Sequence, residues 1–307
     1  MLHPYLADGR QLLAQYMTDL GGGAQFRDVI AAYRDGCIPA DYVAELAAIA
    51  AMIGVSPDEV LVVNLYYDLL KVVLGCTAFA VDTDNGPLHA RNLDWWTEND
   101  LLARSTVLVD MHGAAAGPFR VVAWPGFIGA LSGVAPGRFA ISLNAVLSDE
   151  PPAVAAPITF VLRSVFETAR TFAEAVDQLV ATEIASDCLL LVTGTQHGEM
   201  VVVERTPTRA AVRHADRGRL VVANEYRALA TNGTAAGTEQ ELQRTSCGRF
   251  DRATALLAQH GPWRATDCFS VLADPAVQMR LTVQQMVMSA AQGTLEVRLP
   301  SGGQTAA

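Results

Sequence analysis

The chain has 307 residues, which is enough for one large domain with a sizeable core and short for three domains. Hydrophobic residues make up 51% of the chain and charged residues 18%, which excludes a disordered or fibrous protein. Acidic residues outnumber basic ones by 32 to 22, for a net charge of -10, so nucleic acid is not an expected partner.

The cysteine pattern and the first residues bear on the cellular compartment. An odd number of widely spaced cysteines, with no Cys-x-x-Cys pair, indicates reduced thiols: Cys37, Cys76, Cys188, Cys247 and Cys268. Asp8 and Arg10 interrupt the stretch that a signal peptide would need to be apolar. The most apolar stretch, Val60 to Leu74, is broken by polar residues and shorter than the roughly 20 residues that span a bilayer. We therefore expect a cytoplasmic protein.

The sequence up to Gly75 has a helical pattern. Asp41 to Ile53 places apolar residues at helical spacing, and Gly54 ends that helix. Ser56-Pro57-Asp58-Glu59 combines an N-cap serine, a proline at the first helical position and a glutamate three residues after the serine. This capping box predicts a helix that runs to about Leu74.

From Cys76 the hydrophobic period changes to two, which predicts strands. The first two are joined through Asp84-Asn85-Gly86, a hairpin signal. With Asn85-Gly86 as a two-residue loop, Thr77 faces Asp94, Cys76 faces Trp95 and Ala80 faces Arg91. That register leaves Arg91 roughly 13 Å along the ladder from Cys76.

The remaining elements are expected in blocks. The expected strands are 77–82, 87–92, 106–110, 119–124, 139–144, 188–193, 200–205, 210–214, 220–223, 282–289 and 294–299, and the expected helices are 157–169, 172–183, 248–258 and 267–272. Thr171-x-x-Glu174 is a second capping box. Runs of strands alternate with paired helices rather than with single crossover helices. The fold class is therefore α+β, with antiparallel sheets faced by helices.

Cys76 has two interpretations. A lone cysteine at the start of a strand is most often a small buried hydrophobic residue. The preceding Gly75 has no Cβ, so its carbonyl can be approached closely by the Cys76 sulfur. That arrangement suits an intramolecular attack on the Gly75-Cys76 peptide bond.

Three segments together resemble a known group. Leu61-Val62-Val63-Asn64-Leu65-Tyr66-Tyr67-Asp68, Cys76-Thr77 and Arg91-Asn92-Leu93-Asp94 are similar to the acid ceramidase and N-acylethanolamine acid amidase family of N-terminal nucleophile hydrolases. The last two segments are shared with choloylglycine hydrolases and isopenicillin N acyltransferase. The resemblance implies a four-layer αββα sandwich and self-cleavage between Gly75 and Cys76. Residues 1–75 would be a helical, propeptide-like segment, and 76–307 the catalytic domain.

Downstream segments extend the resemblance. Asn144 in Ile141-Ser142-Leu143-Asn144 and Asn224 in Val221-Val222-Ala223-Asn224-Glu225-Tyr226 match the elements that supply oxyanion-hole asparagines. Arg249 in Ser246-Cys247-Gly248-Arg249-Phe250 matches an arginine near the nucleophile. Taken alone, an asparagine is usually a strand cap or turn residue, and Arg249 could equally be a surface cation.

The implied mechanism needs a base for the thiol, because the thiolate is the reactive form. After cleavage, Cys76 carries an α-amine, a group whose ordinary pKa of about 7.7 to 8.0 suits general-base work. Asn144 and Asn224 would donate to the oxyanion, Asp94 would hold the α-amine, and Arg91 with Arg249 would favour the thiolate. No cofactor is implied. The histidines show no ligand spacing, so no metal site is expected: His89, His112, His197, His214 and His260.

The expected activity is hydrolysis of a linear amide in a small N-acyl compound through a thioester. Transfer of the acyl group to an amine and an uncleaved, non-catalytic ligand-binding protein on the same fold are the alternatives. Trp95 and Trp96 could line an acyl pocket or simply fill the core. A homo-oligomer is possible, and membrane contact lacks support because no basic amphipathic helix is visible.

Overall fold

The computed structural model describes residues 3–21, 27–70, 75–95, 98–230, 238–259 and 261–300. Its helices are α1 (His3–Asp19), α2 (Arg27–Gly36), α3 (Ala40–Ile53), α4 (Pro57–Asn64), α5 (Tyr66–Leu70), the 3₁₀ turn η2 (Glu98–Asp100), α6 (Leu101–Arg104), α7 (Ile158–Thr168), α8 (Phe172–Ala181), α9 (Thr238–Gln259) and α10 (Ala265–Leu272). Its strands are β1 (Gly75–Val81), β2 (Leu88–Asp94), β3 (Val107–Met111), β4 (Phe119–Ala123), β5 (Ser132–Ala135), β6 (Phe139–Asn144), β7 (Cys188–Thr193), β8 (Met200–Arg205), β9 (Ala210–His214), β10 (Arg219–Val222), β11 (Thr282–Ser289) and β12 (Thr294–Arg298).

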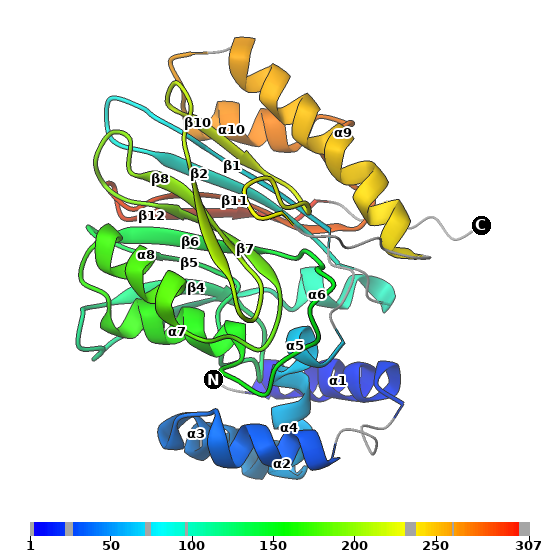
Figure 1. Ribbon diagram of the computed structural model, residues 1–307. Helices are drawn as coiled ribbons and strands as arrows, with labels where there is room; N and C mark the ends of the chain where they lie inside the picture. The colour runs from blue at the N-terminus through cyan, green and yellow to red at the C-terminus, as the bar shows by residue number, and fades with distance from the viewer. Residues whose placement is uncertain are drawn as a thin grey trace.

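Two antiparallel sheets form the middle of the molecule, as expected. One has five strands in the order β10-β1-β2-β11-β12, and the other has seven in the order β3-β4-β5-β6-β7-β8-β9. Helices α9 and α10 cover the outer face of the first sheet, and α7 and α8 cover that of the second (Figure 1). These layers confirm the predicted αββα sandwich.

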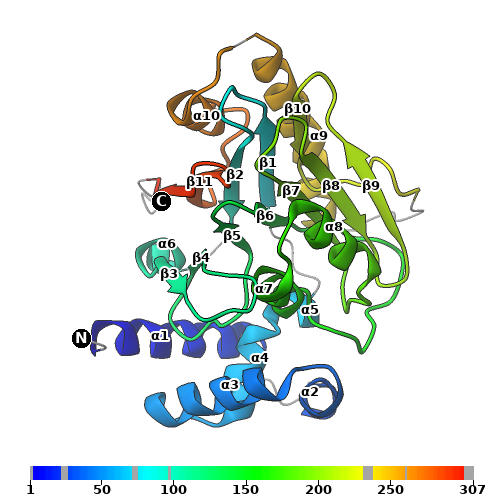
Figure 2. The same ribbon diagram turned by 90° about the vertical axis from the view of Figure 1, so that its left-hand side faces the viewer.

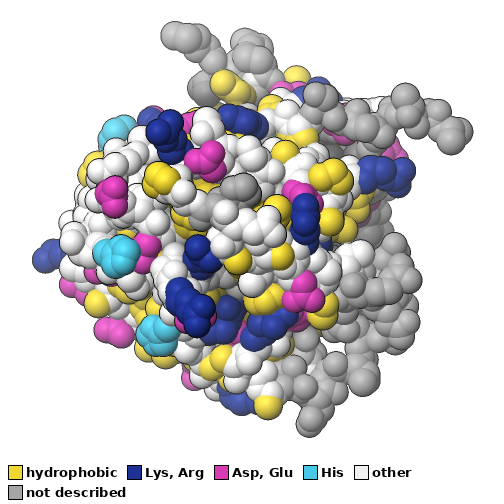
Figure 3. All heavy atoms as spheres, turned by 90° about the horizontal axis from the view of Figure 1, so that it is seen from above, with side chains coloured by type: hydrophobic (Ala, Val, Ile, Leu, Met, Phe, Trp, Pro, Cys, Tyr) yellow, Lys and Arg dark blue, Asp and Glu magenta, His cyan; other side chains and the backbone are white. Residues whose placement is uncertain are grey.

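Helices α9 and α10 form one outer layer of the sandwich, and the outer side of this layer faces solvent (Figure 1). Figure 3 shows basic and acidic side chains interspersed with small hydrophobic areas on the face above α9 and α10. The inner side of these helices packs on outward-facing side chains of the five-stranded sheet, among them Phe79, Val81 and Leu88. The buried apolar side chains of α9 and α10 therefore face the five-stranded sheet.

The N-terminal helices lie against one end of the sandwich (Figures 1 and 2). One continuous apolar cluster joins them to it, because Leu12, Tyr16 and Leu61 pack in the same group as Leu131, Ile141 and Phe166. Within the described residues no single helix has the length and composition of a membrane span, although α3 and α4 meet those criteria as a pair bent by 117°.

The second N-terminal helix differs from the prediction. The capping box is present, since the Ser56 side chain accepts from Glu59 N at 3.2 Å and Glu59 Oε2 accepts from Ser56 N at 2.8 Å. The helix breaks at Leu65 instead of running to Leu74, and residues 71–74 lie outside the described part. The break turns the chain so that Leu65 is fully buried and the Tyr67 hydroxyl donates to the carbonyl of Asp187 at 2.7 Å.

The register of the first hairpin also differs from the prediction. The turn is centred on Asp84-Asn85, because Gly86 N donates to the Thr83 carbonyl at 3.1 Å and Gly86 takes a left-handed φ of 86°. The ladder therefore pairs Cys76 with Leu93 and Ala78 with Arg91. This shift by two residues keeps every side chain on its predicted face but moves Arg91 towards Cys76.

Candidate active site

Cys76 lies at the start of β1, on the face of the five-stranded sheet that looks towards the seven-stranded sheet. The next residues on that face, Ala78 and Ala80, pack between the two sheets. The Cys76 side chain is fully buried, and its Sγ lies 3.9 Å from the carbonyl oxygen of Leu143 on β6. The sulfur therefore sits between the sheets, where neighbouring charges act without much screening.

Arg91 on β2 supplies such a charge. Its Nη2 donates to Cys76 Sγ at 3.2 Å, as the diagonal neighbour across the ladder. Its Nη1 donates to the Leu131 carbonyl at 3.1 Å, and the guanidinium also contacts Ser132 Oγ and the Leu143 carbonyl. Arg91 thus ties β2 to β5 and β6 while keeping one donor on the sulfur.

The backbone of Cys76 is held by the other predicted residues. Asn224, two residues beyond β10, accepts from Cys76 N at 3.1 Å through Oδ1. Arg249 on α9 donates to Cys76 O at 2.6 Å and to Asn224 Oδ1 at 2.8 Å. Arg249 is only 4% exposed, so it is not a surface cation, and burial lowers its pKa against the opposing effects of Asp94, Cys76 and Glu225.

Asp94 lies beside the peptide that is predicted to be cut. It pairs with Gly75 in the ladder, and its Oδ1 accepts from the Thr282 hydroxyl at 2.5 Å. Among the described residues, its buried Oδ2 has no hydrogen-bond partner. Burial raises the pKa of Asp94, while Arg249, the Thr282 hydrogen bond and Arg91 act in the opposite direction.

Gly75 leaves no room for a side chain. A Cβ at this position would stand 2.8 Å from Met279 Sδ and 2.9 Å from Asp94 Cβ. The absence of a Cβ therefore lets β2 and the segment before β11 close around the Gly75-Cys76 peptide.

Asn144 ends β6 and faces the five-stranded sheet. Its Nδ2 donates to the carbonyls of Val222 at 3.3 Å and Ala223 at 2.9 Å, and its buried Oδ1 has no partner within the described residues. The Nδ2 of Asn224 donates to the Ala145 carbonyl at 2.7 Å. Both side-chain amides are thus bonded to backbone carbonyls in the intact chain.

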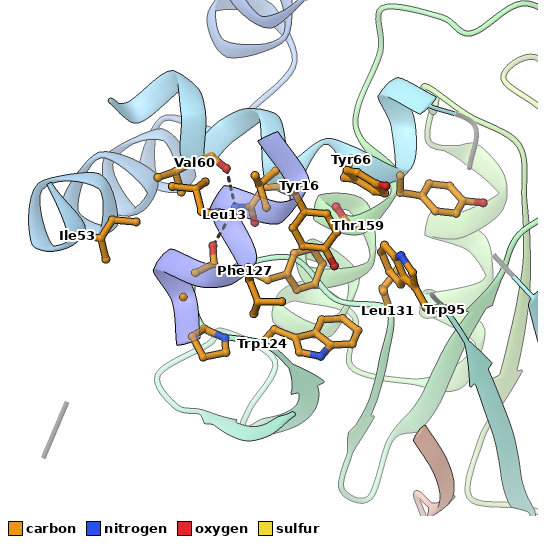
Figure 4. Close-up of a pocket in the computed structure, with 17 residues that line it drawn as sticks. Leu13, Tyr16, Ile53, Val60, Tyr66, Trp95, Trp124, Phe127, Leu131 and Thr159 are labelled. Atoms are coloured by element: carbon orange, nitrogen blue, oxygen red, sulfur yellow. Dashed lines mark hydrogen bonds between the residues drawn. The ribbon is translucent and has the colours of Figure 1, made fainter. Parts of the chain in front are cut away.

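An apolar pocket, here called the acyl pocket, opens beside this cluster (Figure 4). Its volume is about 40 Å³, and its apolar and aromatic walls include Leu12, Leu13, Tyr16, Tyr66, Trp95 and Leu131. Trp95 follows Asp94, and the Leu131 carbonyl accepts from Arg91, so one end of the pocket adjoins the residues around Cys76. Trp96 lies outside the described residues.

Two threonines of the site, Thr77 and Thr282, were not predicted from the sequence. The Thr77 hydroxyl accepts from Arg249 Nη1 at 2.7 Å, and Thr282 is the partner of Asp94. Thr77 stands in the Cys76-Thr77 motif but had no role assigned to it, and Thr282 is an ordinary strand residue that no local signal marks. In the described part of the chain, no three His, Cys, Asp or Glu side chains gather as a metal site would require.

Comparisons with known proteins agree with this geometry. The profile of the family described as acyl-coenzyme A:6-aminopenicillanic acid acyl-transferase matches residues 81–301, which contain every predicted site residue except Gly75 and Cys76. The N-acylethanolamine-hydrolyzing acid amidase of Caenorhabditis elegans is 30% identical over 183 residues, 54% of this chain and 51% of the relative. The acid ceramidase of Mus musculus is 26% identical over 194 residues, 55% of this chain and 48% of the relative. The chain thus spans about half the length of the curated relatives it matches.

Solved structures with a similar fold are also found. The Caenorhabditis elegans N-acylethanolamine-hydrolyzing acid amidase ortholog has a TM-score of 0.58 at 25% identity, covering 74% of this chain and 95% of that one. A mutant of the conjugated bile acid hydrolase of Clostridium perfringens shares the fold, with a TM-score of 0.53 at 14% identity over 75% of this chain and 90% of that one. The chain belongs to the acyl-coenzyme A:6-aminopenicillanic acid acyl-transferase family, because the model of that family matches residues 81–301, more than half of its length.

Proposed function

We propose that this protein cuts itself between Gly75 and Cys76 and then uses the Cys76 thiolate to hydrolyse the amide bond of a small N-acyl compound. The observation that carries the proposal is the arrangement around Cys76. Arg91 donates to its sulfur at 3.2 Å, while Asn224 and Arg249 hold its nitrogen and its carbonyl oxygen. Any buried residue needs partners for its backbone groups, but a structural cysteine does not need a cation on its sulfur.

The proposed self-cleavage begins with the sulfur of Cys76. Cys76 Sγ attacks the carbonyl carbon of Gly75, the C–N bond breaks, and the nitrogen takes up a proton to become the α-amine of Cys76. Water then hydrolyses the thioester, which leaves a Gly75 carboxylate and a free thiol. Asp94 would hold the new amine. It pairs with Gly75 in the ladder, and its Oδ2 has no hydrogen-bond partner among the described residues.

Amide hydrolysis repeats the same chemistry on a substrate. The α-amine accepts the thiol proton, the sulfur attacks the substrate carbonyl, and the protonated amine product leaves a thioester that water cleaves. Arg91 stabilises the anionic sulfur, and Arg249 keeps the backbone of Cys76 in place. The side-chain amides of Asn144 and Asn224 would donate to the oxyanion instead of to the backbone carbonyls that they bond in the intact chain. Losing one such donor typically lowers the rate by about 10² to 10³.

The acyl pocket suggests which amides fit. Its walls come both from the N-terminal helices and from the sandwich, and they carry mainly apolar and aromatic side chains. The relatives are named for N-acylethanolamine and ceramide amides. We therefore infer a substrate with an aliphatic acyl chain, and a 1–75 segment that stays bound to the 76–307 domain after cleavage. A cytoplasmic location belongs to the same proposal, supported by the free state of all five cysteines.

Intact mass and activity test the proposal together. The purified protein should give one fragment ending at Gly75 and another beginning at Cys76, whereas Cys76→Ala should stay whole and inactive. Cys188→Ala is the matched control, because Cys188 is also a fully buried cysteine near the start of a strand. A Cys76→Ala protein that is cut and hydrolyses N-acyl amides, or a wild-type protein that is active but uncut, would end the proposal.

The family description favours one second candidate, acyl transfer to an amine. The thioester is common to both reactions, and the outcome depends on whether water or an amine attacks it. Incubating the protein with an N-acyl amide, with and without a competing amine, and weighing the products separates them. A new amide formed faster than the free acid would assign transfer.

A further inference from the structure

A second cavity lies next to the acyl pocket, and we call it the side cavity. Its volume is about 50 Å³, and its apolar wall is formed by Val109, Met111, Val121 and Ile128. Arg163 and Glu45, whose Nη1 and Oε2 are 2.7 Å apart, form a polar part of its wall. Phe127 lines both cavities.

The ring of Phe127 stands at the boundary between the two. A Cβ placed on Gly129, a wall residue of the side cavity, would meet Phe127 Cζ at 3.0 Å and Thr159 Oγ1 at 2.9 Å. Thr159 belongs to the wall of the acyl pocket. The tip of the ring therefore lies where the two walls meet, and Figure 4 shows Phe127 near the centre of the residues that line the acyl pocket.

The backbone of Phe127 is fixed from both sides. Asn64 on α4 donates to the Gly126 carbonyl and accepts from Ile128 N, at 2.9 and 2.8 Å. Phe127 N itself donates to the Trp124 carbonyl at 3.1 Å, and the two rings meet edge to face at 6.0 Å. A side chain with such support is a wall of defined position rather than a mobile loop residue.

We propose that Phe127 sets the acyl-chain length that this enzyme accepts, by closing the acyl pocket against the side cavity. The inference rests on the proposed amide hydrolysis and adds its specificity-determining residue. With the ring in place, an acyl chain ends in the acyl pocket. Without the ring, the two cavities join, and the chain extends until it meets the Arg163–Glu45 pair.

The expected size of the effect follows from the volumes. A cavity needs about 10 to 15 Å³ by this measure to hold one water-sized group, so the side cavity has room for roughly three or four methylenes. Each buried methylene is worth about a fourfold gain in kcat/KM. Phe127→Ala should therefore move the optimum to chains that are about two to four carbons longer.

The experiment uses a series of saturated N-acyl amides with one amine and chains lengthened in steps of two carbons. The self-cleaved wild type is compared with Phe127→Ala, with Met111→Trp, which narrows the side cavity alone, and with both changes together. Phe127→Ala should shift the optimum, Met111→Trp should leave it unchanged, and the double variant should return to the wild-type optimum. Phe127→Leu, a milder change, should shift the optimum in the same direction by less.

A second arm needs no turnover. Displacement of a fluorescent fatty acid by saturated fatty acids, measured in the Cys76→Ala background with and without Phe127→Ala, should rank chain lengths in the same way. An unchanged length preference in this arm overturns the role of Phe127, whatever the activity. A shifted preference in binding together with a wild-type protein that cleaves no amide instead supports Phe127 and overturns the proposed function.

Discussion

Arg91 is a fully buried cation whose guanidinium makes no ion pair among the described residues. One of its N–H groups donates to the Cys76 sulfur. An unpaired buried charge is unfavourable for folding unless something else requires it. The negative charge of a thiolate is such a partner. On the proposed mechanism, the Cys76 thiolate would therefore supply the negative partner of Arg91.

Arg91→Gln should lower kcat/KM by about 10² to 10³ and move the acid side of its pH profile to higher pH, because the thiolate loses its cation. Arg91→Lys retains the charge and should keep the profile near that of the wild type, with a smaller loss. Rates of N-acyl amide hydrolysis between pH 5 and 9 provide the measurement. Equal pH profiles for the glutamine and lysine variants would contradict the electrostatic role.

Gly75→Ala should slow or stop self-cleavage, because the new Cβ would stand within 3 Å of Asp94 Cβ and Met279 Sδ. Separation of β2 from β1 by even a few tenths of an ångström misplaces the carbonyl that the sulfur must reach. The time course of fragment formation by mass spectrometry measures this. Gly36→Ala, at a position with no neighbour within 4 Å of a Cβ, should cut at the wild-type rate. Equal rates for both variants would show that the space at residue 75 is unimportant.

At the scale of elements, five strands rich in apolar residues were predicted to the residue, namely β6, β7, β8, β9 and β11. The strand β5 was missed because Ser132-Gly133-Val134-Ala135 has little β propensity. Its glycine is required by packing, since a Cβ on Gly133 would stand 2.7 Å from the Arg120 carbonyl oxygen. Tertiary contact, not local propensity, makes this segment a strand.

The candidate site was predictable as a set of residues but not as a set of contacts. The sequence motifs named Arg91, Asn224 and Arg249, whereas the hairpin signal placed Arg91 too far from the sulfur. The Asn-Gly pair predicts a turn centred on Asn85-Gly86, whereas in the structure Gly86 is the residue after the two central ones. A two-residue error in one turn was enough to hide the contact between Arg91 and the Cys76 sulfur.

The loop that follows Asn224 depends on one carboxylate on β8. Glu204 is fully buried and accepts from the backbone nitrogens of Arg227, Ala228 and Leu229 at 2.8 to 3.1 Å. Glu204→Gln presents an NH₂ group to these donors and should lower the free energy of unfolding by about 2 kcal/mol. Because the loop positions Asn224, we expect kcat/KM to fall as well.

Glu199→Gln is the matched control for this prediction, since Glu199 Oε2 accepts from the backbone nitrogens of Thr195 and Gln196 at 2.8 Å in the β7–β8 connection. It should lower stability in urea unfolding but leave kcat/KM unchanged. If both variants lose stability and neither loses activity, the Glu204 loop does not position Asn224.

At the scale of the whole molecule, the N-terminal helices are docked on the sandwich through a buried carboxyl group. Asp68 on α5 accepts from Ile158 N, the first residue of α7, at 3.3 Å, and the Ser186 hydroxyl donates to its backbone carbonyl at 3.4 Å. Its second carboxyl oxygen has no partner in the described part of the chain. Burial raises the pKa of Asp68 to about 7, although the hydrogen bond from Ile158 N and the nearby Ser186 hydroxyl act in the opposite direction.

A raised carboxyl pKa makes the folded state hold a proton that the unfolded state releases near pH 4. The contribution of Asp68 to stability is therefore fully present below pH 4, declines by up to about 1.4 kcal/mol per pH unit, and is lost once the pH exceeds about 7.

Asp68→Asn keeps an acceptor for Ile158 N and cannot ionise. Urea unfolding of both proteins at pH 5 and pH 8 should show the variant gaining stability relative to the wild type at the higher pH. An equal difference at both pH values would mean that Asp68 ionises normally and that the docking of the N-terminal helices does not depend on its proton.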